Sequence, residues 1–335
     1  MGKKLKLADI AALAGVSKST VSFVLNGHAE KHRITKETVQ RVMQVVEANN
    51  YSPSVYARAL KSKKTSTYGL VIPDLLNMGF AAIAKELERL CLLSGYQLLI
   101  ASTEDDPMTE QQAISNLIDR QVDGIMVASC HNDDVYYQSI AKDLPIVFFD
   151  RRFESSHYHF ITTNAYDATK ALLSKTTQDH DECAYIGGQF ELSPSRDRYQ
   201  GYVDALKENG IELNTDIIFS HDYQPQSGYD MMSQCVQTLG RLPRCLFTAS
   251  YSLLEGVLRY LNDHNLLGAG DTLSMKIATF DNYSILDCLP LRIDSIEQDC
   301  LALAAALFEC LRRCTSNADC PSQMVIPAQI HWRND

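Results

Sequence analysis

The sequence has no apolar run of 18 or more residues, the length that a membrane-spanning helix needs. Its basic N-terminus has neither a long apolar core nor a small-residue cleavage site, so it does not resemble a secretory signal. There is no GxGxxG after the first expected strand, no GxxxxGK[ST] and no GxSxG. These absences argue against a membrane protein, a secreted protein and the common nucleotide-binding and hydrolase enzymes, and they favour a cytoplasmic protein.

The ten cysteines form no CxxC pair and show no paired Cys/His spacing. Most lie in apolar runs, which predicts buried, reduced thiols in a cytosolic protein. Cys310 and Cys314 lie one helical turn apart, which does not by itself make a metal site. The nine histidines lie mostly in polar segments without ligand spacing. We therefore expect no metal, no cofactor and no enzymatic activity.

The 335-residue chain has a formal net charge of −10, but this charge is unevenly distributed. Residues 1–65 carry 12 lysines and arginines against 4 acidic residues, a net charge of +8, which leaves −18 on the remainder. A chain of this length is long enough for two domains. A compact basic segment beside an acidic body favours a polyanion-binding domain next to a domain that avoids polyanions.

The basic segment has the pattern of a helix-turn-helix domain. A short first helix is expected at Leu7–Ala14, and Gly15 suits the tight turn that follows it. Ser17 is a good N-cap for a second helix at Lys18–Asn26. Thr35 caps a third helix with a buried stripe of valines.

The second helix is the expected recognition helix. Its first turn would enter the major groove, where short polar or basic side chains reach base edges. Lys18 and Ser19 occupy that position, while Thr20 suits a phosphate contact. Taken singly, a solvated lysine or an ordinary first-turn serine is the alternative. The motif as a unit favours DNA binding.

The segment ADIAALAGVSKSTVSFVLNG, followed by Asn50-Tyr51-Ser52-Pro53, resembles the N-terminal motif of the lactose/galactose repressor family. Many members of that family have arginine where this chain has Phe23, so base readout must differ at that position. The loop Gly27–Ile34 is longer than usual and resembles that of the family's fructose-repressor and sucrose-repressor subgroup.

The resemblance extends to a hinge after Pro53, where Ser54 could cap a short helix. In the family this helix forms only on DNA. Leu60 matches in register a leucine that enters the minor groove, where an apolar wedge unstacks a base step and bends the duplex. An ordinary leucine in a linker helix is the alternative. The expected DNA contacts are Ser17, Lys18, Ser19, Thr20, Ser22, Phe23, Asn26, Tyr51, Ser54, Ala57 and Leu60.

Beyond residue 65, short apolar runs alternate with amphipathic stretches such as Ala81–Leu93 and Glu110–Arg120. This alternation predicts parallel, doubly wound sheets. The pattern restarts at Ala184, which predicts two lobes with a ligand cleft at the carboxyl ends of their strands. The expected strands are Tyr68–Pro73, Gln97–Ser102, Gly124–Ala128, Ile146–Phe149, Ala184–Gly187, Ile217–Ser220, Cys245–Ala249 and Ile277–Phe280.

Polar side chains follow many of these strands. Because sugar hydroxyls both donate and accept hydrogen bonds, carboxylates and guanidinium groups suit them. Any single aspartate here is equally well explained as a helix cap or a turn residue. Their repetition favours a sugar site formed by Asp74, Ser129, Asp150-Arg151, Ser250 and Asp281-Asn282.

The body also resembles the repressor family and, more distantly, periplasmic sugar-binding proteins, through GLVIPDLLNMGFAAIAKELE, PIVFFDRR and SPSRDRYQGYVDAL. The resemblance implies that Arg198 binds the effector and that Tyr223 stacks on it. The segment Thr248–Tyr251 departs from the family's common Thr-Ala-Asn-Asp, so the effector chemistry cannot be copied from the lactose case. The expected effector contacts are Asp74, Gly79, Phe80, Ser129, Asp150, Arg151, Arg198, Tyr223, Ser250 and Asp281.

These features predict a nucleoid-associated repressor that binds double-stranded operator DNA as a homodimer and is released by a small sugar. Resemblance to the subgroup implies a sucrose or fructose operon and a fructose-type effector, either free fructose or fructose 1-phosphate. One alternative is a pleiotropic regulator of carbon metabolism that responds to fructose 1-phosphate. The other is a sugar-binding protein that does not regulate DNA.

The expected fold is α/β, with a three-helix helix-turn-helix domain followed by a two-lobed body like that of periplasmic binding proteins. Dimer contacts are expected chiefly on the N-lobe, the helix at 81–93 among them. The expected boundaries are 1–53 for the DNA-binding domain, 54–65 for the hinge and 66–335 for the body, whose N-lobe takes about 66–164 and 299–325 and whose C-lobe takes about 165–294 and 326–335.

Overall fold

The computed structural model describes residues 5–49, 51, 64–140, 144–153, 157–267 and 275–334. The chain divides into two compact units, Met1–Thr65 and Ser66–Asp335. Each unit is described by itself below. No single helix in the described ranges is long and apolar enough to cross a membrane. The first two helices pass that test only when counted together across a bend of 103°.

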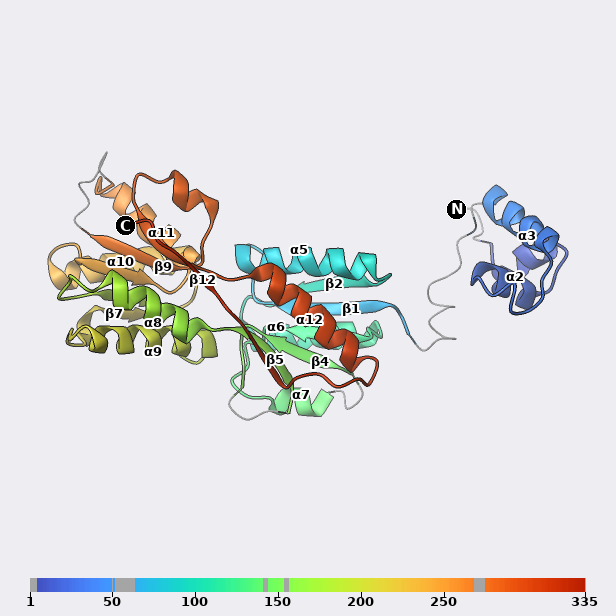
Figure 1. Cartoon of the computed structure of the whole chain (residues 1–335), viewed down its shortest axis with the longest axis horizontal. Helices are drawn as coiled ribbons and strands as arrows, with labels where there is room; N and C mark the ends of the chain where they lie inside the picture. Colours follow the sequence, from blue (N-terminus) through green and yellow to red (C-terminus); the bar gives the residue numbers. More distant parts are fainter. Residues whose placement is uncertain are drawn as a thin grey trace. The chain divides into compact units, whose positions relative to one another are not determined.

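The first unit contains three helices, α1 (Leu7–Leu13), α2 (Lys18–Leu25) and α3 (Lys36–Ala48) (Figure 1). The bend between α1 and α2 is typical of a helix-turn-helix pair. The Ser17 hydroxyl caps α2 by accepting from the Thr20 backbone N–H at 3.1 Å, and Thr35 caps α3 in the same way. The small core that holds the three helices together consists of Ile10, Ala11, Ala14, Val21, Val24 and Val42.

The second unit contains two six-stranded sheets, each forming one lobe. We call the lobe built on the first sheet the N-lobe and the lobe built on the second sheet the C-lobe. The N-lobe sheet has the order β11-β5-β4-β3-β1-β2, and the C-lobe sheet has the matching order β12-β10-β9-β8-β6-β7. The two lobes therefore repeat one doubly wound pattern, as the alternation of apolar runs predicts.

In the N-lobe, α5 and α12 cover one face of the sheet, and α6 and α7 cover the other (Figure 1). Its strands are β1 (Thr67–Ile72), β2 (Gln97–Ser102), β3 (Gly124–Val127), β4 (Ile146–Phe149), β5 (His159–Thr163) and β11 (Gln323–Ile326). Its helices are α5 (Met78–Leu93), α6 (Pro107–Asp119), α7 (Val135–Ile140) and α12 (Cys300–Cys314).

In the C-lobe, α8 and α9 cover one face and α10 and α11 cover the other. Its strands are β6 (Ala184–Gly187), β7 (Ile218–Ser220), β8 (Cys245–Thr248), β9 (Lys276–Phe280), β10 (Ile293–Glu297) and β12 (Gln329–His331). Its helices are α8 (Ala165–Thr176), α9 (Ser193–Glu208), α10 (Pro225–Leu239) and α11 (Tyr251–Asp263), with short 3₁₀ turns at Thr215–Ile217 and Ser284–Cys288.

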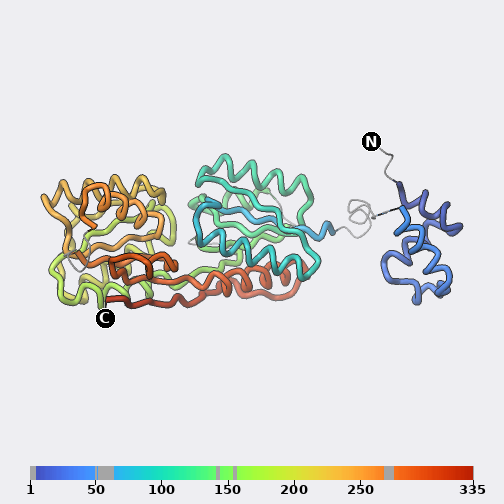
Figure 2. The backbone as a smooth tube through the Cα atoms, turned by 90° about the horizontal axis from the view of Figure 1, so that it is seen from above, coloured from blue at the N-terminus to red at the C-terminus, as the bar shows by residue number. Residues whose placement is uncertain are grey.

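The chain passes between the lobes three times in the described structure, as Figure 2 shows. The three connections run from β5 to α8, from β10 to α12 and from β11 to β12. The last of these places β12 antiparallel to β10, whereas the other strand pairs are parallel. The predicted parallel, doubly wound sheets are thus confirmed, with one antiparallel edge strand, β12, which returns along the hinge instead of entering through a helix.

The cysteines are also not all free. Cys310 in α12 forms a disulfide with Cys320, ten residues further along the chain. The expectation of ten reduced thiols is wrong for this pair, because the chain folds back after α12, so that β11 packs against it and the two side chains meet. Four of the free cysteines are buried, as their apolar surroundings predict: Cys91, Cys183, Cys235 and Cys245.

The close packing of α10 on α11 depends on Gly256. A Cβ atom at this position would lie 1.9 Å from the Pro225 carbonyl oxygen and 2.5 Å from the Tyr229 nitrogen. Because both neighbours are backbone atoms, the helices would have to separate. We expect Gly256→Ala to destabilise the C-lobe by about 2 kcal/mol or more in chemical denaturation. The exposed substitution Gln234→Ala on α10 is the control, and equal stability of the two variants would contradict the packing argument.

Candidate functional site

A cavity of about 590 Å³ lies between the carboxyl ends of the two sheets. Its size is that of a small-molecule site. In a doubly wound sheet, ligands bind outside the carboxyl ends of the strands, where the strand order reverses. Here that reversal falls between β1 and β3 in the N-lobe and between β6 and β8 in the C-lobe. Both lobes contribute side chains to the lining, so the cavity is a hinge site between them.

The N-lobe wall is built around Asp150 and Arg151, directly after β4. Arg151 is 6% exposed and donates to Asp105 at 2.5 Å and to the Ser129 carbonyl oxygen at 3.2 Å. Its Nε atom lies 3.8 Å from Asp150 Oδ2, too far for a hydrogen bond. The φ angle of Asp150 is +60°, a backbone conformation that few non-glycine residues adopt. This turn aims the carboxylate into the cavity.

The C-lobe wall is built around Arg198, in α9. Its guanidinium group lies 3.8 Å from the centroid of the Phe280 ring and donates to the Ala249 carbonyl oxygen at 2.7 Å. Tyr223 lies beside it and makes a 2.6 Å hydrogen bond with the Ser195 hydroxyl. A Cβ atom on Gly188 would lie 2.1 Å from the Tyr223 ring, so glycine is needed there for the ring to fit.

Asp281, after β9, joins the cavity to the connections between the lobes. Its φ angle is +73°, like that of Asp150 after β4. One carboxylate oxygen accepts from the Tyr251 backbone N–H, and the other accepts from the Gln298 amide at 2.9 Å. The side-chain oxygen Oε1 of Gln298 in turn accepts from the Thr163 hydroxyl at 3.0 Å. Because Gln298 and Thr163 belong to two of the connections, a ligand contact at Asp281 reaches the hinge through two hydrogen bonds.

Three polar atoms of the cavity lining are buried and have no hydrogen-bond partner in the described structure: Arg151 Nε, Arg198 Nε and Gln189 Oε1. A buried polar group without a partner costs about 1–3 kcal/mol. Two donors and one acceptor are therefore available to a ligand that both donates and accepts, as a hydroxyl group does.

The comparisons with known proteins agree with this architecture. The model of the bacterial regulatory proteins of the lacI family matches residues 6–54, and that of a periplasmic binding protein domain matches residues 68–285. The sucrose operon repressor of Klebsiella pneumoniae is 41% identical over 334 residues, covering 99% of each chain. The chain belongs to the lacI family.

Two further proteins are similar to this chain over most of its length. The fructose operon regulatory protein of Vibrio cholerae is 34% identical over 340 residues, covering 98% of this chain and all of that protein. The crystal structure of the Cra transcriptional dual regulator of Pseudomonas putida, in complex with fructose 1-phosphate, is 31% identical. It aligns with a TM-score of 0.74 and covers 81% of this chain and 99% of that one.

The cavity of this lacI-family chain contains nine of the ten residues predicted to contact an effector. They are Asp74, Gly79, Phe80, Asp150, Arg151, Arg198, Tyr223, Ser250 and Asp281. Asp74 also has the turn role considered as an alternative for the aspartates, because it accepts from the Leu76 backbone N–H, and Ser250 caps α11. Lining the cavity and capping a turn or helix are thus compatible at these two positions.

Ser129 is the exception among these ten, because it does not line the cavity. Asn282, also predicted at the sugar site, does not line it either, because its amide donates to Glu297 and accepts from Ser295 and Arg333. Ser129 is 1% exposed, and its hydroxyl donates to the buried Glu110 carboxylate at 2.8 Å. Tyr137 and the Cys130 backbone N–H donate to the same carboxylate. Ser129 therefore lies one layer behind the cavity wall, where its carbonyl oxygen accepts from Arg151. The prediction of direct effector contact by its side chain is corrected accordingly.

The cavity also contains polar residues that the sequence did not single out. Asp105 and Gln298 come from loops, and each acts by holding a predicted residue, Arg151 or Asp281. Glu104 and Asp105 could have been predicted from their position alone. They follow the expected strand at Gln97–Ser102, just as Asp74 follows the first expected strand. The other polar residues of the lining are Asn77, Glu104, Thr163, Gln189, Asp222, Gln224, Ser252 and Cys300.

In the first unit, Lys18 and Ser19 are exposed on the first turn of α2. Phe23, further along α2, stacks on His32 with ring centroids 3.5 Å apart, so the long loop folds back over the helix. Asn26 donates to the Ser22 carbonyl oxygen, and Tyr51 packs against the core of the unit. The predicted DNA contacts Ser54, Ala57 and Leu60 lie outside the described residues.

Burial raises the pKa of Asp150, although Arg198 and Arg151 partly oppose the shift. A raised pKa in the folded chain means that ionisation of this carboxyl destabilises the fold. Below the usual pKa of an aspartate, the protonated carboxyl makes its full contribution to the free energy of unfolding. That contribution is lost as the pH rises through the raised pKa of Asp150 in the folded chain. The ligand site thus contains a charge that lowers the stability of the empty protein at neutral pH.

We expect Asp150→Asn to be more stable than the parent protein at pH 7, and we expect the two melting temperatures to converge towards pH 4. Asparagine tolerates a positive φ, so the backbone is not strained by the change. Thermal unfolding at several pH values measures the difference. The exposed Asp263→Asn variant is the control. A variant that is less stable than the parent at pH 7 would contradict the assignment.

Proposed function

We propose that this lacI-family chain is a sequence-specific repressor of a sucrose or fructose utilisation operon, and that a fructose-type sugar releases it from its operator. Relatives that align along the whole chain carry these functions in their names, the sucrose operon repressor of Klebsiella pneumoniae and the fructose operon regulatory protein of Vibrio cholerae. As a regulator of operator DNA, the protein works in the cytoplasm, at the nucleoid.

The observation that carries the proposal is the cavity between the lobes, with charged groups from both sides and three unpartnered polar atoms. A ligand that pairs with Arg151 and Asp150 of the N-lobe and with Arg198 and Asp281 of the C-lobe stabilises one relative lobe orientation. The equilibrium shifts by the difference in the ligand's affinity for the two orientations.

The charge of the cavity favours a neutral sugar over a sugar phosphate. Its lining holds six carboxyl groups and two guanidinium groups. Arg151 is already paired with Asp105, so little positive charge remains for a phosphate. We therefore propose free fructose as the effector. Fructose 1-phosphate, which is bound in the Pseudomonas putida structure, is the second candidate, because the free Nε atoms of Arg151 and Arg198 suit phosphate oxygens.

We propose that two copies of the chain bind a pseudo-palindromic operator, each with α2 in the major groove. The exposed Lys18 and Ser19 are placed to contact base edges, and Thr20 suits a phosphate. Phe23 offers an apolar edge for a thymine methyl group where other family members place an arginine. Leu60 is the proposed wedge in the minor groove.

The proposal is tested with the full chain and an operator selected from a random duplex pool. We expect fructose to weaken operator binding by about tenfold or more, and sucrose and galactose to have no effect.

Asp281→Asn should keep operator binding but lose its response to sugar, whereas Lys18→Ala should lose operator binding but keep sugar binding. Residues 66–335 alone should bind sugar and not DNA.

Asp263→Asn is the matched surface control for these measurements. A response to fructose 1-phosphate alone would overturn the choice of the neutral sugar and leave the repressor assignment intact. Release by galactose alone would overturn the fructose-type assignment. Sugar binding with no effect on the operator complex would leave a sugar-binding protein without a regulatory role.

A further inference from the structure

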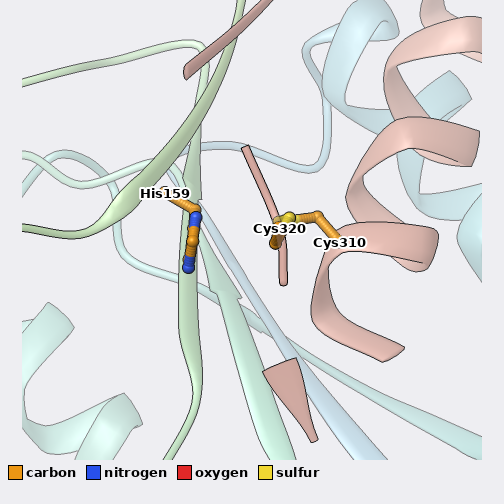
Figure 3. Close-up of side chains that lie close together, drawn as sticks. All are labelled: His159, Cys310 and Cys320. Atoms are coloured by element: carbon orange, nitrogen blue, oxygen red, sulfur yellow. A yellow bond between two sulfur atoms is a disulfide. The ribbon is translucent and has the colours of Figure 1, made fainter. Parts of the chain in front are cut away.

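A cluster of two cysteines and one histidine lies in the N-lobe, among residues that do not line the effector cavity. One nitrogen of the His159 ring and the sulfur atoms of Cys310 and Cys320 all lie within 4.8 Å of one another. Figure 3 shows the imidazole beside the bonded sulfur atoms. Cys310 is 3% exposed, while His159 and Cys320 are half-buried, so the cluster is sheltered but open on one side.

Each member of the cluster lies on a different segment of the N-lobe, away from the connections between the lobes. His159 is the first residue of β5, which leads into α8. Cys310 lies in α12, which enters the N-lobe from β10, and Cys320 precedes β11, which leads into β12. A group that holds all three side chains would therefore fasten β5, α12 and the segment before β11 to one another within the N-lobe.

The neighbouring hydrogen bonds hold the imidazole in place. His159 Nδ1 lies 2.8 Å from the carbonyl oxygen of Pro321, the residue after Cys320. A carbonyl oxygen only accepts, so Nδ1 carries the proton and Nε2 of the neutral ring has a free lone pair. Metal-binding histidines commonly donate their second ring N–H to a carbonyl or carboxylate in this way. The Phe160 backbone N–H also donates to the Ser322 carbonyl oxygen, which fixes the segment after Cys320 beside β5.

We propose that the reduced Cys310/Cys320 pair and His159 bind a thiophilic divalent metal ion such as Zn²⁺. Two thiolates, one imidazole and a water molecule make the four-coordinate N/S set that zinc favours. The two thiolate charges balance the charge of the ion, so the filled site is neutral, as a half-buried position requires. Disulfides are rare in a reducing cytosol, where a pair of cysteines more commonly binds a metal or responds to oxidation.

The disulfide is the alternative state of the same site. Two electrons and two protons from a thiol reductant, itself converted to a disulfide, open the Cys310–Cys320 bond to two thiols. Binding of the ion then releases the two thiol protons. Oxidation by another disulfide reverses the sequence: the S–S bond forms, the reductant's thiols are regenerated and the ion leaves. A metal thus ties β5, α12 and the segment before β11 together in the reduced protein, and only α12 and the segment before β11 are tied in the oxidised protein.

The test is titration of the full chain, reduced with a phosphine, with Zn²⁺ against a chromophoric chelator and with Co²⁺ to detect thiolate-to-metal absorption. We expect one ion per chain. Cys310→Ser and Cys320→Ser should each weaken binding by about 100-fold or more, and His159→Gln by at least about tenfold. Before reduction, the disulfide form should bind no ion at this site. Bound Zn²⁺ should raise the melting temperature of the reduced parent protein.

Cys314→Ser is the matched control, because Cys314 lies one turn further along α12 and is not in the cluster. Circular dichroism checks that each variant is folded, and His159→Gln keeps the test valid if a cysteine variant does not fold. Binding that is equal in the parent protein and His159→Gln, or equal loss in Cys314→Ser and Cys310→Ser, would overturn the proposal. So would a Co²⁺ complex without thiolate absorption.

Discussion

The structure of the body depends on charges that are buried between two lobes and only partly paired. Arg151 and Arg198 are almost fully buried, and each leaves its Nε atom without a partner. Asp150 and Asp281 face the same cavity from turns with positive φ angles. A protein keeps buried polar groups unsatisfied where a ligand is to satisfy them, and it accepts a loss of stability for this. In the proposed function, a sugar supplies the missing partners.

The contacts of Asp281 explain how occupancy of the cavity would reach the rest of the chain. Its carboxylate is linked through Gln298 to Thr163, and these residues lie on two of the three connections between the lobes. The connections are the elements that must adjust when the lobes rotate. A ligand that draws Asp281 into the cavity therefore acts on the hinge directly, without a long chain of intermediates.

Local chemistry explains why much of the fold could be predicted from the sequence. Ser17 and Thr35 begin helices because their hydroxyls cap the first turn, and most of the apolar runs form buried inner strands, while β2 and β7 are partly exposed at the sheet edges. Nine of the ten predicted effector contacts line the cavity, and five of them, Asp74, Asp150, Arg151, Ser250 and Asp281, do so because the carboxyl ends of parallel strands meet at one edge of a sheet. The family resemblance supplied Arg198 and Tyr223, which lie on helix and loop and not at strand ends.

What the sequence did not predict depends on contacts between distant segments. Ser129 follows a strand like the other predicted residues, but the buried Glu110 on α6 binds its hydroxyl away from the cavity. Gln298 can link Asp281 to Thr163 only because it lies where the chain passes from β10 in the C-lobe to α12 in the N-lobe. The pairing of Cys310 with Cys320 needs β11 to lie beside β5, which no local spacing indicates.

In the proposed function, sugar in the cavity and DNA on the helix-turn-helix unit oppose each other. Thermodynamic linkage requires that this opposition be reciprocal. Calorimetric titration of fructose into the free protein and into its operator complex measures it directly. Fructose should bind the complex more weakly, by the same factor by which it weakens operator binding. Identical fructose affinities for the free and the DNA-bound protein would contradict the proposed function.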